Sequence, residues 1–256
     1  MATCKASCAV IARNLSVSFS GHQVLNDLSV EIPPRNLTVI VGRSGTGKST
    51  FLRSLNRLNE EISGSRTKGT VKLSFKDGTV DIYRDSFRLE ELRRRVGMVF
   101  QTPHPLPTSI EKNLSLPLKL VLNVTSSEIG ARIEQALTVA HLWSEVKNRL
   151  KEPALSLSGG QQQRLCLART LALEPEILLL DEPTASLDFK ASEKIENLLS
   201  ELKRDYTIVA VSHSIGQARR IADNILVMKE GKIVSALGAP QFQVRGSLED
   251  LLNEVF

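Results

Sequence analysis

The sequence has 256 residues, of which 41% are hydrophobic and 24% charged, so it is long enough for one or two domains with a buried core. Its net charge is +5, but the basic residues are interspersed with acids, and only the stretch RLEELRRR forms a short basic cluster. This excess is too diffuse to indicate DNA or RNA binding, so we expect no nucleic-acid partner.

The cysteines, the N-terminus and the apolar runs indicate the redox compartment of the chain and whether it enters a membrane. Cys4, Cys8 and Cys166 form neither a disulfide framework nor a zinc pattern, which favours a reducing compartment. The start MATCKASCAV lacks the apolar core of a signal peptide. The longest apolar run, residues 114–122, contains a lysine and is far shorter than the ~20 residues that span a bilayer. We therefore expect a soluble chain whose membrane role comes through a partner.

Two kinds of strand are predicted. Residues 10–37 and 70–83 alternate apolar and polar positions, and KDGT at 76–79 fits a hairpin turn. This period of two is typical of an antiparallel sheet with one buried face. Four other runs, LTVIVG, VGMVFQ, EILLLDE and YTIVAVSH, are almost continuously apolar. Such runs are typical of parallel strands that are covered by helices on both faces.

Helical patterns lie between these strands. Residues 126–142 carry apolar side chains at helical spacing, with Ser126 or Ser127 as the expected cap, and residues 192–205 repeat the pattern. Residues 102–157 have no strong strand signal and are expected to form a helical insertion. The order of strands and helices predicts a doubly wound α/β core.

The stretch VIVGRSGTGKST has the phosphate-loop spacing G-x-x-x-x-G-K-[ST], between a strand and the predicted helix KSTFLRSLNRL. Backbone N–H groups around Gly42, Gly45 and Gly47 can surround a β-phosphate. Lys48 would neutralise phosphate oxygens, and Ser49 would ligate Mg²⁺. A chance glycine-rich turn is the alternative, and the flanking strand and helix argue against it.

A carboxylate pair, Asp181 and Glu182, ends the apolar run ILLLDE. Ligands of open α/β sheets lie beyond the carboxyl ends of the strands, so both acids should face the nucleotide. We expect Asp181 to hold Mg²⁺ through water, opposite Ser49, and Glu182 to accept a proton from the water that attacks the γ-phosphate. Considered without the rest of the sequence, the two acids fit a solvated turn equally well. The phosphate loop upstream favours the interpretation as metal ligand and general base.

Two further strands end in polar groups: Gln101 follows VGMVF, and His213 follows TIVAVS. Each alone is more typical of a loop residue, but the ends of parallel strands converge in space. We expect Gln101 to contact Mg²⁺ or the attacking water and His213 to contact the γ-phosphate. The other histidines, His22, His104 and His141, have no such placement and are expected to be surface or packing residues.

These residues, in this order, resemble the ATP-binding subunits of ABC transporters. The match covers nearly the whole chain: the phosphate loop at 42–50, Gln101, LSGGQ at 157–161, the pair Asp181 and Glu182, SLD at 186–188, and His213. LSGGQ upstream of such a strand is close to diagnostic, whereas the phosphate loop alone indicates only an NTPase. The resemblance implies a P-loop NTPase core with a mostly parallel sheet, an N-terminal antiparallel β-subdomain and an inserted helical subdomain.

The domain boundaries follow from this resemblance. We expect one ABC ATPase domain over residues 1–256. Its nucleotide-binding core should comprise residues 10–101 and 171–240, and its helical signature subdomain residues 102–170. Residues 241–256 would form a short tail.

The resemblance also implies an assembly in which two such chains pair head to tail. The LSGGQ loop of one chain would cap the ATP on the phosphate loop of the other. Ser158 and Gln161 have the spacing of a capping box, Gly159 and Gly160 permit close approach of the backbone, and the helix start offers free N–H donors. Asp188 would lie at the dimer interface.

The expected ATP site therefore uses residues from several segments. Phe19 occupies the family position at which a ring, usually tyrosine, stacks on adenine; a core residue of the first sheet fits its spacing nearly as well. The residues expected to bind ATP are Phe19, Gly42, Arg43, Ser44, Gly45, Thr46, Gly47, Lys48, Ser49, Thr50, Ser158, Gly159, Gly160, Gln161 and Asp188. All motif residues needed for hydrolysis are present, so we expect an active ATPase.

Several stretches are similar to the ATPase subunit of the phosphate-specific import system, including RRRVGMVFQTPHPLPTSI and LWSEVKNRLKEPALSLSGGQQQRLCLAR. The resemblance implies a peripheral subunit, expected as a homodimer, at the cytoplasmic face of the membrane. Its partners would be integral membrane permeases and, through them, an external solute-binding protein. The apolar run 114–122 would contact a permease or form a buried face of the helical subdomain.

Some residues depart from that pattern, namely Phe19, Thr46, the stretch ASLDF and the ending SLEDLLNEVF. Importers of tungstate, other oxyanions or polar amino acids therefore stay as alternatives. Non-transport ABC ATPases are less well matched, because repair members need a coiled coil that residues 102–157 cannot hold, and translation members carry two motif sets. A silent binding module conflicts with the intact Lys48, Glu182 and His213.

Overall fold

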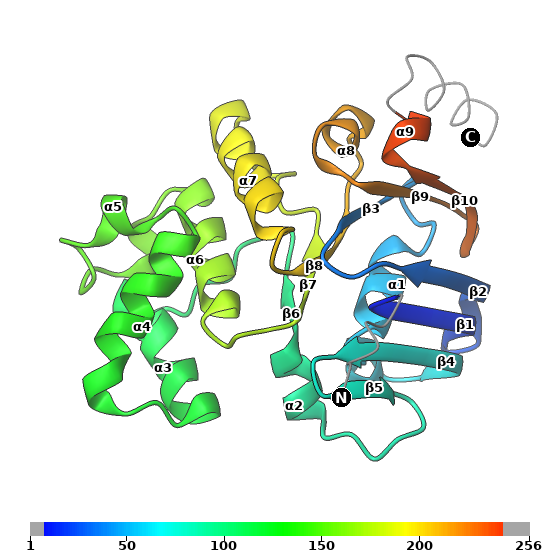
Figure 1. The fold of residues 1–256 in the computed structure, drawn as a ribbon, viewed down its shortest axis with the longest axis horizontal. Helices are drawn as coiled ribbons and strands as arrows, with labels where there is room; N and C mark the ends of the chain where they lie inside the picture. Colours follow the sequence, from blue (N-terminus) through cyan, green and yellow to red (C-terminus); the bar gives the residue numbers. More distant parts are fainter. Residues whose placement is uncertain (1–7, 243–256) are drawn as a thin grey trace, which may run out of the picture.

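We describe residues 8–242 of a computed structural model of the chain (Figure 1). These residues form one antiparallel sheet, one mostly parallel sheet and helices around them, so the predicted α/β fold class is confirmed. Cys4 and nearly all of the predicted tail 241–256 fall outside the described residues.

The antiparallel sheet has the strand order β2–β1–β4–β5. Its strands are β1 (Val10–Phe19), β2 (His22–Ile32), β4 (Ser65–Phe75) and β5 (Gly78–Asp81). The predicted turn at Lys76 and Asp77 joins β4 to β5. Alternate residues of β1 are buried, as expected for a sheet that packs through one face.

The mostly parallel sheet has the strand order β10–β9–β3–β8–β7–β6. Its strands are β3 (Leu37–Val41), β6 (Val96–Val99), β7 (Ile177–Asp181), β8 (Thr207–Val211), β9 (Asn224–Lys229) and β10 (Lys232–Gly238). Only β10 is antiparallel to its neighbour. The four predicted apolar strands are thus parallel, and their carboxyl ends lie along one edge of the sheet.

Two hydrophobic cores cover the two faces of this sheet, which explains why its strands are apolar throughout. The first core lies between the two sheets and contains Phe51 and Leu52 of α1 (Lys48–Ser54) together with Ile40 of β3. The second core contains the neighbouring β3 residues Val39 and Val41. It is closed by α7 (Phe189–Leu202), α8 (Ile215–Ile221) and α9 (Ala239–Phe242).

A separate hydrophobic core holds a group of helices at one end of the molecule (Figure 1). These helices are α3 (Ile110–Leu122), α4 (Ser126–Val139), α5 (Trp143–Val146) and α6 (Gly159–Leu171). Helix α6 takes part in two cores, with Leu165 facing this group and Leu167 facing the parallel sheet. It therefore connects the helical group to the sheet. No helix within residues 8–242 has the length and apolar character needed to cross a membrane.

Two local predictions were wrong. The cap of α4 is Thr125, not Ser126 or Ser127, and the Glu128 carboxylate accepts hydrogen bonds from both the backbone N–H and the hydroxyl of Thr125. Helix α1 ends at Ser54, short of the predicted segment, and a 3₁₀ turn, η1 (Leu58–Glu61), follows. The Asn59 side chain donates to the carbonyl of Thr50 and the hydroxyl of Ser54, which satisfies groups at the helix end.

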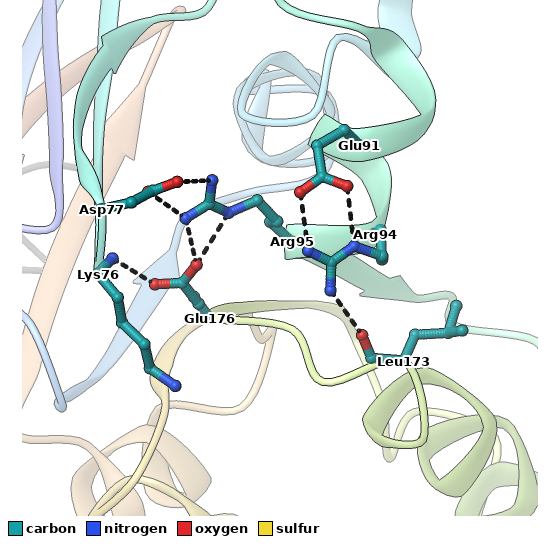
Figure 2. Close-up of polar contacts among 7 residues, drawn as sticks. All are labelled: Lys76, Asp77, Glu91, Arg94, Arg95, Leu173 and Glu176. Atoms are coloured by element: carbon teal, nitrogen blue, oxygen red, sulfur yellow. Dashed lines mark hydrogen bonds and ion pairs between the residues drawn. The ribbon is translucent and has the colours of Figure 1, made fainter. Parts of the chain in front are cut away.

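The antiparallel sheet is fastened to the parallel sheet by an ion-pair group that we call the Arg95 cluster: Asp77, Arg95 and Glu176 (Figure 2). Arg95 ends α2 (Leu89–Arg95), and its guanidinium donates to Glu176 at 2.9 and 2.6 Å and to Asp77 at 2.9 and 2.5 Å. It also lies 4.0 Å from the centre of the Phe75 ring. Glu176 in turn accepts from the backbone N–H of Lys76 at 2.7 Å.

Beside this cluster, Arg94 also contacts the connection between α6 and β7, which contains Glu176 (Figure 2). It donates to both oxygens of Glu91 and to the carbonyl of Leu173 in the connection between α6 and β7. The hydrogen bonds that Arg94 and Arg95 donate to Leu173 and Glu176 thus hold the start of β6 against the start of β7, at the edge opposite the predicted nucleotide site.

Candidate nucleotide site

The phosphate loop connects β3 to α1, as the sequence predicts. Gly47 caps α1 with φ of 100°, a left-handed conformation that favours glycine, and a Cβ atom there would lie 2.8 Å from a methyl of Leu25. Thr46 donates its backbone N–H and its hydroxyl to the carbonyl of Arg43. Thr46, one of the departures from the family pattern, is therefore part of the internal hydrogen bonding that shapes the loop.

Lys48 is buried at the start of α1, with 5% of its surface exposed. Its ammonium donates to the carbonyls of Gly42 and Arg43, at 2.8 Å each, and so lies inside the curve of the loop. Burial lowers the pKa of Lys48 below its ordinary value, while the nearby carboxylates of Glu182 and Asp181 oppose the shift. The arrangement places a buried cation where phosphate oxygens could replace its carbonyl partners.

Ser49 and Asp181, the predicted magnesium pair, are in direct contact: the Ser49 hydroxyl donates to Asp181 Oδ1 at 2.7 Å. Asp181 is 5% exposed, and Arg53 Nη2 lies 3.6 Å from its other oxygen. A hydroxyl oxygen next to a carboxylate is the kind of oxygen donor set that Mg²⁺ prefers. The residues therefore fit the ion.

Glu182 and His213, predicted from two different strand ends, are also brought together. His213 Nε2 lies 2.6 Å from Glu182 Oε1, and the backbone N–H of Glu182 donates to the carbonyl of Val211. Glu182 has φ of 48°, and a non-glycine residue in that region carries backbone strain of a kind that is concentrated at functional sites. Strand pairing of β7 with β8 accounts for the proximity, because Asp181 is opposite Val211.

Gln101 and Phe19 are less tightly connected to this group. Gln101 is exposed and follows β6, whose residue Val99 pairs with Leu180, so it lies at the same edge of the sheet as Asp181. Phe19 is partly buried at the end of β1 and packs against the first core. Both alternatives for Phe19 thus stay open, a core residue and a ring with one accessible face.

The LSGGQ stretch forms the start of α6 as expected from its spacing. Ser158 is the N-cap, its hydroxyl accepts from the Gln161 backbone, and the Gln161 side chain accepts from the Ser158 backbone. A Cβ on Gly160 would lie 2.8 Å from Cβ of Ala191, so a larger residue would press against α7. Asp188 caps α7 by accepting from the Ala191 backbone. The stretch thus packs beside the 187–191 segment, and Figure 1 shows α6 well apart from α1.

Glu145 of α5 orients this helix start, a role that motif spacing does not reveal. It accepts hydrogen bonds from Gln161, from Arg164 and, at 3.3 Å, from Lys194 of α7. Burial of Glu145 disfavours its charge, but the hydrogen bonds from Arg164 and Gln161 outweigh burial and lower its pKa to about 2.

An open cavity of about 750 Å³ adjoins the site between α7 and α8. Glu182 and His213 line one side of it, and no residue of the phosphate loop lines it. The wall of this cavity includes a hydrogen-bonded polar group that the sequence motifs also miss, made of Thr184, Glu196, Ser212 and Gln217. Gln217 follows His213 by four residues, and that spacing is the only hint of it in the sequence.

Comparison with known proteins decides the family. A family model described as "ABC transporter" matches residues 25–185, more than half of the chain. The chain belongs to the ABC transporter family.

Curated ABC transporter relatives match most of the chain. It is 50% identical over 227 residues to "Phosphate import ATP-binding protein PstB" of Pyrobaculum aerophilum, covering 87% of this chain and 88% of that one. It is 45% identical over 221 residues to "Phosphate import ATP-binding protein PstB 3" of Streptococcus pneumoniae serotype 4, covering 86% and 87%.

Solved ABC structures share the fold. One is the ATP-binding cassette MJ0796 in a dimeric, post-hydrolysis state bound to ADP and phosphate, with a TM-score of 0.75, 30% identity and coverage of 90% of this chain and 98% of that one. Another is cbiO1 from Clostridium perfringens, part of the transporter complex cbiONQ, with a TM-score of 0.79, 27% identity and coverage of 97% and 95%. The fold of the chain is that of ABC ATPase domains, and ATP is the nucleotide that such domains bind.

Proposed function

We propose that this chain is the ATP-hydrolysing subunit of an importer for inorganic phosphate. The observation that carries the proposal is the agreement between two kinds of evidence. The relatives at 45–50% identity are named as phosphate import ATP-binding proteins. The buried Lys48, the Ser49–Asp181 contact and the Glu182–His213 contact together supply the groups that hydrolysis needs.

The phosphate loop would bind the triphosphate. Exchange of the two Lys48 carbonyl partners for β- and γ-phosphate oxygens would keep two hydrogen bonds to its ammonium. The backbone N–H groups of the loop would donate to the same oxygens. The loop residues assigned to ATP are Gly42, Arg43, Ser44, Gly45, Thr46, Gly47, Lys48, Ser49 and Thr50.

Ser49 and Asp181 would hold Mg²⁺, with Gln101 approaching from the end of β6. A bound Mg²⁺ would supply neutralisation of charge on the phosphate oxygens. Ser49 and Arg53 contact different oxygens of the Asp181 carboxylate, Ser49 through a hydrogen bond and Arg53 through an ion pair at 3.6 Å.

Hydrolysis would depend on Glu182 and His213. Glu182 accepts the proton of the attacking water as the water oxygen bonds to the γ-phosphorus and the bond from that phosphorus to the bridging oxygen breaks. His213, 2.6 Å from Glu182, fixes the carboxylate and can donate to the departing phosphate. Glu182 has a left-handed backbone conformation with φ of 48°, directly after the last residue of β7.

A second copy of the chain would complete each site. Ser158, Gly159, Gly160 and Gln161 belong to a helix start that is held by Glu145 and lies apart from α1 in its own chain (Figure 1). Free N–H groups there suit the γ-phosphate on a partner's phosphate loop. Asp188 would lie at the same interface, and Phe19 would contact the adenine.

The remaining assignments follow from this role. We assign residues 102–170 to a helical signature subdomain and residues 10–101 and 171–240 to the core. The partners would be integral membrane permeases at the cytoplasmic face of the membrane, and an external solute-binding protein would act through them.

An ATPase assay on the purified chain tests the enzymatic part. Glu182→Gln should slow turnover by ~10²-fold or more while ATP still binds, as expected for the loss of a general base. Glu134→Gln, an exposed glutamate on α4, is the matched control and should hydrolyse ATP at the wild-type rate. Turnover of Glu182→Gln at the control rate would remove Glu182 from its role.

The cargo needs a transport measurement. Vesicles that contain the chain with its permease subunits and a phosphate-binding protein should accumulate radiolabelled phosphate when ATP is present on the side of the chain. Uptake of tungstate or of a polar amino acid in place of phosphate would overturn the assigned cargo while leaving the ATPase assignment intact.

A further inference from the structure

The side chain of Gln217 in α8 hydrogen-bonds to two loops of the candidate site, residues 182–184 and residues 212–214. It is buried, with 7% of its surface exposed. Its side-chain oxygen accepts from the Ser212 hydroxyl at 2.8 Å, and its nitrogen donates to the Thr184 hydroxyl at 2.7 Å and to the Glu196 carboxylate at 3.2 Å. Both amide hydrogens and one acceptor position of the carboxamide are therefore engaged.

The orientation of this amide is imposed by Glu196. That carboxylate is 8% exposed and accepts two hydrogen bonds from Arg220, at 2.9 and 2.8 Å. It also accepts from the nitrogen of Gln217, so the oxygen of the amide is left for Ser212. Glu196 thus determines that the Gln217 oxygen faces Ser212.

The partners of Gln217 lie beside the two candidate catalytic groups. Ser212 directly precedes His213, and its hydroxyl also accepts from the backbone N–H of Ser214 at 3.0 Å. Thr184 follows Glu182 by two residues. One carboxamide therefore holds the 182–184 loop and the 212–214 loop in a fixed relation.

Folding of α8 does not require this side chain. The N-cap hydrogen bond of the helix runs from the backbone N–H of Gln217 to the Ser214 hydroxyl, and any residue except proline could donate it from position 217. An apolar side chain would fill the same space without the cost of burying an amide. A buried polar cluster whose members are all hydrogen-bonded instead selects one geometry.

We infer that Gln217 is a positioning residue for ATP hydrolysis, which sets the relation between His213 and Glu182 by linking their loops. The inference rests on the proposed ATPase function. Gln217 has no assigned contact with the phosphate loop, so its effect should fall on turnover and not on ATP binding. Misplacement of a reacting group by about 1 Å can reduce a rate ~10²-fold.

Steady-state ATPase kinetics of the full chain test this. Gln217→Met keeps the length of the side chain and removes its hydrogen bonds; it should lower kcat by about 10-fold or more, in line with a small displacement of the catalytic pair. KM for ATP and the binding of a fluorescent ATP analogue should stay within about twofold of wild type. Thr184→Val, which removes only one partner and preserves shape, should lower kcat in the same direction.

The link between the two residues is tested by their double variant. If both act through the one hydrogen bond, Gln217→Met with Thr184→Val should lose little more activity than Gln217→Met alone. Independent, multiplied losses would overturn the inference. Thr184→Val also keeps the inference testable if Gln217→Met does not fold.

Asn113 provides the matched control for stability. It is a fully buried amide whose side chain hydrogen-bonds within the helical group, to Leu106 and Ser109. Asn113→Leu should lower the melting temperature but keep kcat at 25 °C. Equal loss of kcat in both variants, or an unchanged kcat in Gln217→Met, would overturn the inference. Absence of hydrolysis in the wild type would instead refute the proposed function.

Discussion

The Arg95 cluster gives the sharpest prediction about stability. Replacement of Arg95 by methionine keeps an apolar chain against the Phe75 ring and removes the guanidinium. The side chain of Glu176 is 17% exposed and accepts hydrogen bonds from the Arg95 guanidinium and the Lys76 backbone N–H. Of these two donors, only the Lys76 backbone N–H would remain. An unpaired carboxylate at this depth is costly.

The magnitude follows from this burial. Loss of one partner of a fully buried pair costs about 3–5 kcal/mol, and the partial exposure of Glu176 places Arg95→Met at about 3 kcal/mol. A chain of this size loses about 2–4 °C in Tm for each kcal/mol, so Tm should fall by roughly 6–12 °C.

Scanning calorimetry at pH 7 measures this change, with Arg149→Met as the control. Arg149 also donates twice to a glutamate, Glu152, but both side chains are well exposed, at 37% and 48%. The control should lose about 0.2–1 kcal/mol. If Arg95→Met and Arg149→Met melt at the same temperature, the Arg95 cluster does not fasten the two sheets.

Three further predictions concern the site. The low pKa of Glu145 adds stability to the fold that is complete above the ordinary pKa near 4.5 and is lost as pH falls towards 2. The difference in urea midpoint between wild type and Glu145→Gln should therefore be constant from pH 5 to 7 and shrink below pH 4.5. A difference that stays constant down to pH 3 would contradict this expectation. Lys48→Ala should bind a fluorescent ATP analogue at least ~10-fold more weakly, because it removes the buried cation of the loop; unchanged affinity would exclude Lys48 from phosphate binding. Gly47→Ala should also abolish tight ATP binding, because its Cβ would meet Leu25 and its left-handed backbone is strained, whereas the exposed Gly130 in α4 should accept alanine without effect on binding.

The sequence predicted the parts of the site that depend on strand ends. Once LTVIVG, ILLLD and TIVAV are assigned to neighbouring parallel strands, Lys48, Asp181 and His213 must lie along one edge, and pairing of β7 with β8 brings Glu182 to His213. Hydrophobic character predicts that these strands are buried on both faces, and the strand order that makes them neighbours comes from the structure.

Local ends were less well predicted. The capping-box spacing S/T-x-x-E identifies Thr125 with Glu128, whereas proximity to the glutamate favoured the two serines between them. The early end of α1 depends on Asn59, whose side chain replaces helical hydrogen bonds; the apolar pattern continues past Ser54 and gives no sign of it.

Residues that act through tertiary contacts could not be predicted. Glu145 and Gln161 are 16 residues apart, and Gln217 and Thr184 are 33 apart, so no spacing rule connects them. Asp77 and Glu176, which share Arg95, are brought together only when the two sheets pack.

In the proposed assembly, each ATP site is completed by the LSGGQ loop of a second chain. Sedimentation velocity of Glu182→Gln with ATP and Mg²⁺ tests it most directly. We expect a dimer with ATP and a monomer without it. When Ser158→Arg is added, we expect a monomer with ATP, although the double variant still binds ATP. A dimer that persists in the Ser158→Arg background, or a Glu182→Gln chain that binds ATP and stays monomeric, would refute the shared ATP site.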